Sequence, residues 1–392
     1  MKIDLSTEIA GVVLENPLIV ASGTPTRTAE HIIKCFKAGA GGAVTKTITY
    51  AEIHRIQPKP RMYVINPINA IKGEYFSFYS IELMSELKPE KWVNEIKRIK
   101  ERYPDKFLIA SIAGRNLEEW EKLSRLVDEA GADAIELNLS CPHVEKDEFM
   151  GKAAAGKTNI IYNIVKTVRK TASIPVIGKL TPQGANPLEI AKVMYSAGID
   201  AVVSTARFQG LILDMNLIEP ILWKGFGGYG GPWQLPISLA WTAHIAMEIP
   251  NLTIIGSGGI FSGKDAAAFI LVGASAFQIC TAVIVRTYRI IELILKELSE
   301  WMLRKGYMRI EDYRREALLK IKSLEELNRE KIFRVKVDRN KCTGCGICYE
   351  RCFYNAIMMD EGKPKIDYTL CDNCGLCIVI CPNKALRIER NS

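Results

Sequence analysis

The sequence lacks any stretch of about 18 apolar residues free of charge, the length that a membrane-spanning helix needs. It also lacks a block of about five consecutive basic residues, so its formal net charge of +8 is spread along the chain. We therefore expect neither a membrane protein nor a nucleic-acid-binding surface. The opening residues 1–5 contain no apolar core and no small-residue cleavage site, which predicts no secretory signal and a cytoplasmic location.

Cysteine is scarce before residue 340, where only Cys35, Cys141 and Cys280 occur, but eight more lie between Cys342 and Cys381. A secreted disulfide scaffold would be short and rich in cysteine throughout, whereas this chain is long and rich in cysteine only near its end. We therefore interpret the cysteine-rich segment as a site for soft metals in a reducing compartment.

The cysteine-rich segment contains the run Cys-x-x-Cys-x-x-Cys-x-x-x-Cys twice. This is the spacing of two-cluster ferredoxins, in which the fourth cysteine of each run ligates the cluster of the other run. A pair of structural zinc sites is the alternative, because thiolates also bind zinc. We expect two [4Fe–4S] clusters, one held by Cys342, Cys345, Cys348 and Cys381 and the other by Cys371, Cys374, Cys377 and Cys352.

Upstream of the cysteines, short apolar runs alternate with amphipathic stretches. Strands that alternate with helices predict parallel pairing, and eight such units in about 300 residues fit a closed (β/α)8 barrel. An open doubly wound sheet is the alternative. The expected strands are 18–22, 42–46, 107–112, 134–139, 175–180, 201–206, 253–258 and 277–280, and the expected helices include 29–38, 117–130, 160–169, 187–197 and 263–272.

Two connections, 47–89 and 208–250, are too long to be simple turns. Both leave the carboxyl ends of predicted strands, where barrel enzymes place their chemistry, so we expect them to cover a substrate. The fold class that we predict is α/β, with a (β/α)8 barrel over 1–305, a helical connector over 306–330 and a two-cluster ferredoxin-like domain over 331–392.

A barrel that feeds one-electron clusters needs a cofactor that converts electron pairs into single electrons, and flavin does this. The glycines of 256–260 and the segment 280–282 follow the seventh and eighth strands, where barrels bind phosphate. Lys46 and Lys179 end two strands, and a lysine there needs an anionic partner such as reduced flavin. Otherwise each is a rim lysine that reaches solvent. These features predict bound FMN.

Cys141 lies just past the fourth strand, in the segment Glu136-Leu137-Asn138-Leu139-Ser140-Cys141-Pro142-His143. A thiol in this place exchanges a proton with a substrate carbon while the flavin exchanges a hydride. Cys35 and Cys280 are interpreted as inert core residues, the usual state of an isolated cysteine. The glycine- and alanine-rich segment 151–156 follows Cys141 and distinguishes it from them.

Two glycine motifs resemble nucleotide-binding loops. Residues 151–158 match the P-loop pattern of nucleotide triphosphatases, but no strand runs directly into the loop as that site requires. Residues 225–231 resemble a dinucleotide fingerprint, but we expect no following helix that would bind pyrophosphate. We interpret the first as a loop beside Cys141 and the second as a glycine loop on the flavin side.

Together these residues resemble the FMN-binding family of dihydroorotate and dihydropyrimidine dehydrogenases over nearly the whole chain. The shared motifs are 21–25, 44–47, 81–83, 137–143, 179–182, 226–231, 257–260 and the ferredoxin tail. The resemblance implies that Cys141 is the general acid/base and that 151–156 belongs to a loop closing over the substrate. It further implies that FMN is held by Ala21, Ser22, Lys46, Thr47, Asn138, Lys179, Gly231, Gly258, Gly259, Cys280 and Thr281.

The predicted substrate residues depart from this family. Its pyrimidine-binding members use asparagine amides, which donate and accept, to read the edge of the ring. Asn138 matches one of them, but Ser80 stands where another is expected, and the end of the sixth strand offers Thr205 and no asparagine. The substrate is therefore less well predicted than the flavin.

The resemblance implies an oxidoreductase that interconverts a pyrimidine, of uracil, thymine or orotate type, and its 5,6-dihydro form. Because no NAD- or FAD-binding domain is visible, the electron partner is expected to be a separate flavoprotein subunit or a soluble ferredoxin, and we expect an oligomer. The alternatives are an FMN barrel acting on another unsaturated substrate, a tRNA dihydrouridine synthase, which would need a basic RNA-binding face, and a non-catalytic electron relay.

Overall fold

The computed structural model describes residues 3–141, 149–223, 225–327 and 333–390. It divides into two compact units, Met1–Lys320 and Ile321–Ser392. Within the described residues, no helix is both long enough and apolar enough to cross a membrane.

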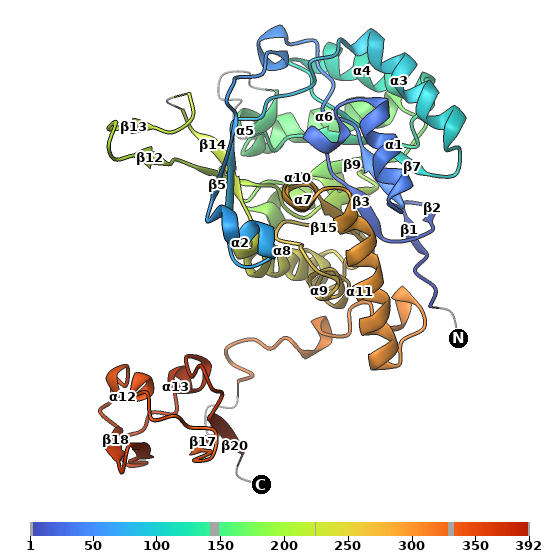
Figure 1. Cartoon of the computed structure of the whole chain (residues 1–392). Helices are drawn as coiled ribbons and strands as arrows, with labels where there is room; N and C mark the ends of the chain where they lie inside the picture. The colour runs from blue at the N-terminus through green and yellow to red at the C-terminus, as the bar shows by residue number, and fades with distance from the viewer. Residues whose placement is uncertain (1–2, 142–148, 224, 328–332, 391–392) are drawn as a thin grey trace. The chain divides into compact units, whose positions relative to one another are not determined.

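Eight parallel strands in the first unit close into a barrel (Figure 1). Each strand pairs with its neighbours in chain order, and the last pairs with the first. The (β/α)8 barrel predicted from the alternating pattern is therefore confirmed. Its strands are β3 (Leu18–Val20), β4 (Gly42–Val44), β7 (Phe107–Ile112), β8 (Ala134–Asn138), β9 (Val176–Lys179), β10 (Ala201–Val203), β15 (Thr253–Ser257) and β16 (Ala276–Ile279).

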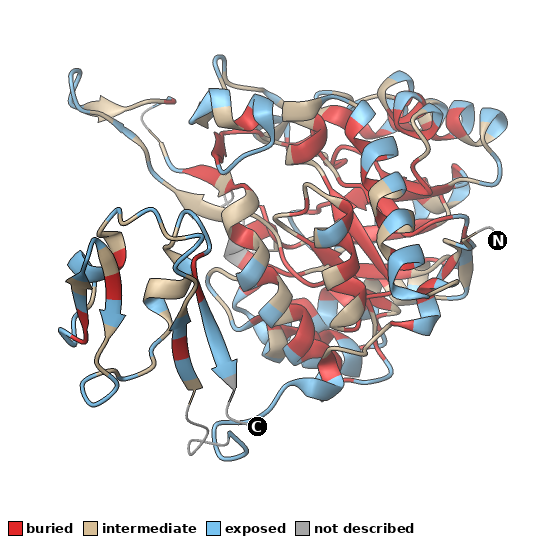
Figure 2. Ribbon diagram, turned by 60° about the horizontal axis from the view of Figure 1, so that its bottom comes forward, coloured by how far each residue is buried: buried red, intermediate tan, exposed pale blue. Residues whose placement is uncertain are grey.

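Helices surround the barrel and bury their apolar faces against its strands, as Figure 2 shows. The side chains packed between the two layers form the largest apolar cluster of the unit, which is the usual source of stability in this fold. The main helices are α1 (Ala29–Lys37), α3 (Pro89–Arg102), α4 (Leu117–Glu129), α6 (Thr158–Thr171), α7 (Pro187–Ser196), α8 (Leu235–Glu248), α9 (Gly263–Leu271) and α11 (Arg289–Lys305).

The two-residue period of the strands places polar groups at the carboxyl end of the barrel. Ile177 lies in the apolar cluster inside the barrel, so Lys179, two residues further along β9, also points inward. In β8, Glu136 likewise lies two residues after the inward-facing Ala134, so its side chain also points into the barrel. The hairpin of β1 (Thr7–Ile9) and β2 (Val12–Leu14) contributes to the same apolar cluster. The interior of the barrel is therefore polar at the carboxyl ends of the strands and apolar deeper inside.

The two long connections meet in a separate antiparallel sheet of four strands, in the order β11-β14-β6-β5. The first connection supplies β5 (Met62–Ile65) and β6 (Ser77–Ser80), with the short α2 (Pro67–Lys72) between them. The second supplies β11 (Phe208–Gly210) and β14 (Gly227–Gly230), and the small hairpin of β12 (Leu213–Asp214) and β13 (Glu219–Pro220) extends from them (Figure 1).

One expectation about the glycine motif 225–231 was wrong. No helix was expected after it, but the 3-10 helix η3 (Pro232–Gln234) and α8 follow directly. Apolar residues lie all around α8, so its sequence lacks the alternation between an apolar and a polar face that predicts a helix. The glycines themselves lie mainly in β14, paired with β6 and β11, so they do not form a strand-to-helix dinucleotide loop.

Helix α11 ends at Lys305 because Gly306 adopts a left-handed conformation with φ +83°. Beyond it, the described residues 307–327 contain only the 3-10 helices η4 (Ile310–Asp312) and η5 (Leu318–Lys320). The connector is therefore less helical than its charge pattern predicts. Tyr313 packs into the core of the first unit, which explains why that unit continues to Lys320.

The second unit is the ferredoxin-like domain that the cysteine spacing predicts. Two antiparallel pairs, β17 (Phe333–Val337) with β20 (Leu386–Arg390) and β18 (Ile357–Asp360) with β19 (Lys363–Ile366), are joined through α12 (Ile347–Glu350) and α13 (Leu376–Val379). The start of the predicted domain at 331 lies outside the described residues. Gly346 and Gly375 precede the two helices with φ values of +77° and +79°, which glycine adopts without strain.

Candidate functional site

One cavity lies at the carboxyl ends of the barrel strands, bordered by the four-stranded sheet. It collects side chains from β3, β4, β8, β9, β15 and β16 and from the segments that follow them. All eleven residues expected to hold the flavin line it, and so does the predicted acid/base Cys141. These residues are Ala21, Ser22, Lys46, Thr47, Asn138, Cys141, Lys179, Gly231, Gly258, Gly259, Cys280 and Thr281.

The glycines after β15 permit a close approach of backbone segments. Gly258 and Gly259 have φ values of +98° and +86°. A Cβ atom on Gly258 would lie 2.3 Å from Nε2 of Gln234, and one on Gly259 would lie 2.4 Å from the backbone nitrogen of Leu235. Both positions therefore require glycine. The short helix α10 (Thr281–Arg286) begins at Thr281 on the same side of the cavity, as predicted.

Both cavity lysines have carboxylate partners within the chain. Lys46 Nζ donates to Glu82 Oε1 at 2.6 Å. Lys179 Nζ lies 3.4 Å from Glu136 Oε1 and donates to Gln278 Oε1 at 2.9 Å, and Gln278 in turn donates to Glu136. Sequence reasoning missed both carboxylates. For Glu136 the signal was available, because its spacing from Ala134 directs it into the barrel.

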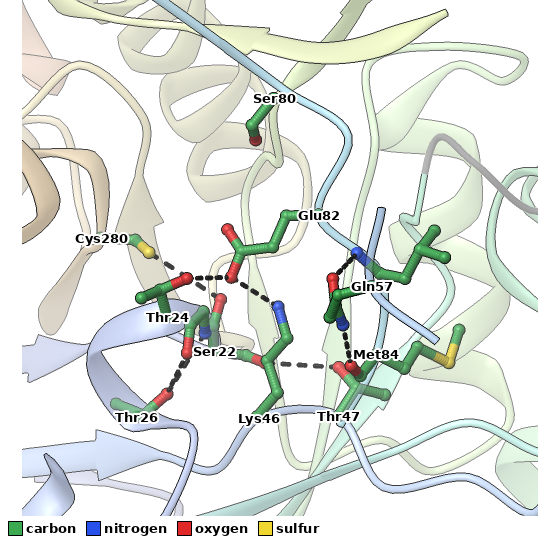
Figure 3. Close-up of polar contacts among 12 residues, drawn as sticks. Ser22, Thr24, Thr26, Lys46, Thr47, Gln57, Ser80, Glu82, Met84 and Cys280 are labelled. Carbon is green, nitrogen blue, oxygen red and sulfur yellow. Dashed lines mark hydrogen bonds and ion pairs between the residues drawn. The ribbon is translucent and has the colours of Figure 1, made fainter. Parts of the chain in front are cut away.

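Several contacts fix Glu82 beside Lys46, as Figure 3 shows. Thr24 Oγ1 donates to Glu82 Oε1 at 2.8 Å. Gln57 holds the following backbone by accepting from Leu83 N at 2.9 Å and donating to the Met84 carbonyl at 2.6 Å. The loop that carries Glu82 is therefore tied to the barrel through Thr24 and to an earlier part of the same long connection through Gln57.

The environment of Glu82 keeps its carboxyl group ionised. Burial alone would raise the pKa, but the positive charges of Lys46 and Arg207, together with hydrogen bonds from Lys46 and Thr24, outweigh it. The net result lowers the pKa of Glu82 from 4.5 to about 2. The cavity wall thus holds a permanent buried ion pair at neutral pH.

A chain of hydroxyl and amide groups connects the predicted flavin-binding residues. Asn138 Nδ2 donates to Thr47 Oγ1 at 2.9 Å, and Thr47 shares hydrogen bonds with Ser111 at 3.0 Å and Ser22 at 3.3 Å. The side-chain amide oxygen of Asn138, Oδ1, accepts from Ser140 Oγ at 3.1 Å. The orientation of the Asn138 amide is thereby fixed at the cavity.

Cys141 is nearly buried, with 9% of its surface exposed, and lines the cavity. Pro142 and His143 of its motif lie outside the described residues. Burial raises the pKa of Cys35 far above its ordinary value. Burial, with the nearby charge of Glu82, raises the pKa of Cys280 to about 11. These two thiols therefore stay protonated at neutral pH. Cys35 is a core residue as interpreted, whereas Cys280 is only partly buried and lines the cavity, so its interpretation as a core residue was wrong.

The two substituted substrate positions do not line this cavity. Ser80 is fully buried and accepts a hydrogen bond from Arg207 Nη1. Thr205 is also fully buried, and its hydroxyl bonds Ser238 Oγ and the Ser257 carbonyl. Their predicted substrate roles stay predictions, and any such role is indirect in this geometry. Ala206 and Arg207, which sequence reasoning did not single out, line the cavity in the region expected for Thr205.

The P-loop-like motif does not form a phosphate loop. Its first residues form the short helix α5 (Gly151–Ala155), and α6 begins at Thr158. In a P-loop site the residues between the two glycines form an open loop that leads from a strand into a helix, whereas here they form a helical turn. The structure therefore disfavours nucleotide binding by this motif.

In the ferredoxin-like unit the eight cysteines surround two separate cavities. Among the described residues no group of three or more histidine, cysteine or acidic side chains is close enough together to hold a single metal ion. The fourth cysteine of each run lines the cavity of the other run. The first cavity is lined by Cys342, Cys345, Cys348 and Cys381, and the second by Cys352, Cys371, Cys374 and Cys377.

Comparisons with known proteins agree with this arrangement. The family model for dihydroorotate dehydrogenase matches residues 4–302, and that for the 4Fe-4S dicluster domain matches 341–385. The PreA subunit of the NAD-dependent dihydropyrimidine dehydrogenase of Escherichia coli strain K12 is 31% identical over 89% of this chain and 85% of its own length. The catalytic subunit of dihydroorotate dehydrogenase B (NAD(+)) of Pyrococcus abyssi is 34% identical over 79% of this chain and 97% of its own length. The chain thus belongs to the dihydroorotate dehydrogenase family of oxidoreductases and carries a 4Fe-4S domain at its carboxyl end.

Proposed function

We propose that this chain is a flavin-dependent enzyme that interconverts a pyrimidine and its 5,6-dihydro form. The observation that carries the proposal is that the predicted flavin-binding residues and Cys141 line one cavity at the carboxyl end of the barrel. The names of the Escherichia coli and Pyrococcus abyssi relatives support a pyrimidine as the substrate class.

The cavity residues fit FMN. Gly258 and Gly259 have positive φ values and pack directly against Gln234 and Leu235, and a loop without side chains at these positions suits the close approach of backbone N–H groups to a phosphate. Lys46, Lys179 and Asn138 supply donors at the other parts of the cavity. When bound, FMN would exchange a hydride with one carbon of the substrate ring.

Cys141 is proposed as the general acid/base. Its thiol would hold the proton that the neighbouring ring carbon gains or loses. Its near-complete burial excludes water, which protects this exchange from solvent. Asn138, fixed by Thr47 and Ser140, would orient the substrate by a bond from or to its amide.

The two cysteine-lined cavities support two [4Fe–4S] clusters that carry electrons between the flavin and a partner. The names of the relatives include the words subunit and catalytic subunit, which supports a separate electron-transfer partner, a flavoprotein or a ferredoxin. We further propose that the chain works as an oligomer in the cytoplasm.

The test is an anaerobic titration of reconstituted holoprotein with dihydroorotate, dihydrouracil and dihydrothymine while the flavin spectrum is recorded. At least one of them should bleach the flavin at equimolar amounts. Reconstituted protein that stays colourless, or a flavin that none of the three reduces, contradicts the proposal. Bleaching that responds to tRNA instead would assign the chain to RNA modification.

A further inference from the structure

Arg207 is a charged residue of the cavity that the proposed function leaves unused. It follows β10, lines the cavity and is partly buried. Its side chain lies along the glycine-rich strand β14, where a Cβ atom on Gly228 would stand 2.7 Å from the guanidinium carbon. A Cβ atom on Gly230 would stand 3.4 Å from Cγ of the same side chain. Because Gly228 and Gly230 have no side chains, Arg207 has room to lie along β14.

The described carboxylates near Arg207 are already paired with other residues, so none of them forms an ion pair with Arg207. Glu82 already pairs with Lys46 at 2.6 Å, and Glu136 is the partner of Lys179. In the described part of the chain no carboxylate lies within ion-pair distance of Arg207, although its field contributes to the low pKa of Glu82. Among the described residues its hydrogen-bond partner is Ser80 Oγ, which is neutral. The cavity wall thus carries a surplus positive charge.

In the same region the amide of Gln234 lines the cavity, but its Nε2 already donates to the Ala206 carbonyl at 2.9 Å. Ala206 lines the cavity without a polar side chain, and Ser80, which lies behind the wall, has only a hydroxyl that already accepts from Arg207. A guanidinium has five donors in a planar fork, which matches the two oxygens of a carboxylate. The Arg207 guanidinium therefore gives this part of the cavity wall a group suited to binding an anion.

We propose that Arg207 is a specificity-determining residue that binds a carboxylate on the substrate, so that the enzyme acts on an acidic dihydropyrimidine rather than a neutral one. This inference rests on the proposed function. Lys46 is already paired with Glu82, and Thr24 holds Glu82 in place by a further hydrogen bond. Within the described ranges Arg207 has the Ser80 hydroxyl alone to exchange for a stronger acceptor.

The test measures binding of orotate and uracil to the oxidised, FMN-loaded protein by the change in the flavin spectrum. Arg207→Met should weaken orotate binding about 10- to 100-fold, the usual value of a hydrogen bond to a charged group, and change uracil binding less than about 3-fold. Arg207→Lys should recover part of the loss, because it restores the charge without the fork. Arg125→Met, which removes an exposed arginine of α4, is the matched control.

A second measurement needs no variant. The methyl ester of orotate has the same ring without the charge, so the wild-type protein should bind it about 10-fold more weakly than orotate. Equal binding of the acid and its ester, or an Arg207→Met variant that weakens orotate and uracil alike, would overturn the inference. FMN content of each variant shows whether the cavity has kept its fold.

Flavin reduction separates this inference from the proposed function. If orotate binds through Arg207 but no dihydropyrimidine reduces the flavin, the proposed function fails and the anion site stands. If dihydrouracil and dihydrothymine reduce the flavin and dihydroorotate does not, the proposed function stands and the role of Arg207 fails.

Discussion

Lys46 and Glu82 form a buried ion pair that joins the barrel to the sheet that covers it. The Nζ and Oε1 atoms are 2.6 Å apart, and only 9% and 5% of the two side chains are exposed. Lys46 stands two residues past β4, and Glu82 stands two residues past β6. A buried charge that loses its partner is costly, so each of these residues depends on the other for its place in the cavity wall.

Glu82→Gln should destabilise the barrel by about 3–5 kcal/mol at pH 7, because it leaves Lys46 buried without a counter-charge. The pKa of Glu82 is lowered from 4.5 to about 2 in the folded state. Its contribution is therefore complete above pH 5 and is lost as the pH falls towards 2. The difference between wild type and variant should shrink over that window.

Tryptophan fluorescence during urea unfolding measures this difference for the barrel alone, because all six tryptophans precede residue 302. Glu118→Gln, at an exposed surface pair, is the control and should change stability by less than about 1 kcal/mol. A Glu82→Gln effect that stays constant from pH 7 to pH 3 would contradict the linkage.

Cys141→Ala should keep FMN and iron but lose turnover by a factor of about 10² to 10⁴, the usual contribution of general acid/base catalysis. Steady-state rates with the substrate found by titration measure the effect. Cys35→Ser is the matched control, since that thiol is buried away from the cavity between the Pro25 and His31 carbonyls. Unchanged turnover in Cys141→Ala would remove its proposed role.

Gly258→Ala should release FMN. The new Cβ would overlap Gln234 Nε2 at 2.3 Å, and both the positive φ and the overlap displace the loop after β15. Overpacking of this kind costs about 1–3 kcal/mol. Gly198→Ala is the control, because its φ is +91° but nothing lies within 4 Å of the added atom. If both variants retain FMN equally, the loop does not hold the cofactor.

The barrel and most of the cavity could be predicted from the sequence because both follow from local patterns. The strand ends near Lys46, Asn138 and Lys179 were visible from periodicity, and the glycines after β15 from composition. Glu82 was not found, because its ion pair joins segments 36 residues apart through a sheet that the sequence does not reveal.

The residues expected to contact the substrate were predicted less well for a related reason. Thr205 keeps the inward period of β10, but that strand ends at Val203, and the hydroxyl turns to Ser238 and the Ser257 carbonyl. Once the regular strand ends, the two-residue period no longer decides which side chain faces the cavity. Arg207 reaches it only because β14, from a distant segment, is built of glycine.

The assignment of cysteines to clusters leads to the last prediction. Cys345→Ala and Cys381→Ala belong to different parts of the sequence but line the same cavity, so both should lose the same electron paramagnetic resonance signal. Cys352→Ala should lose the other signal, together with Cys374→Ala. Each variant should keep about four of about eight iron atoms, reduce its flavin with substrate normally and reoxidise it slowly. If Cys352→Ala loses the same signal as Cys345→Ala, each run holds its own cluster, and the crossed ligation that the cavities support is wrong.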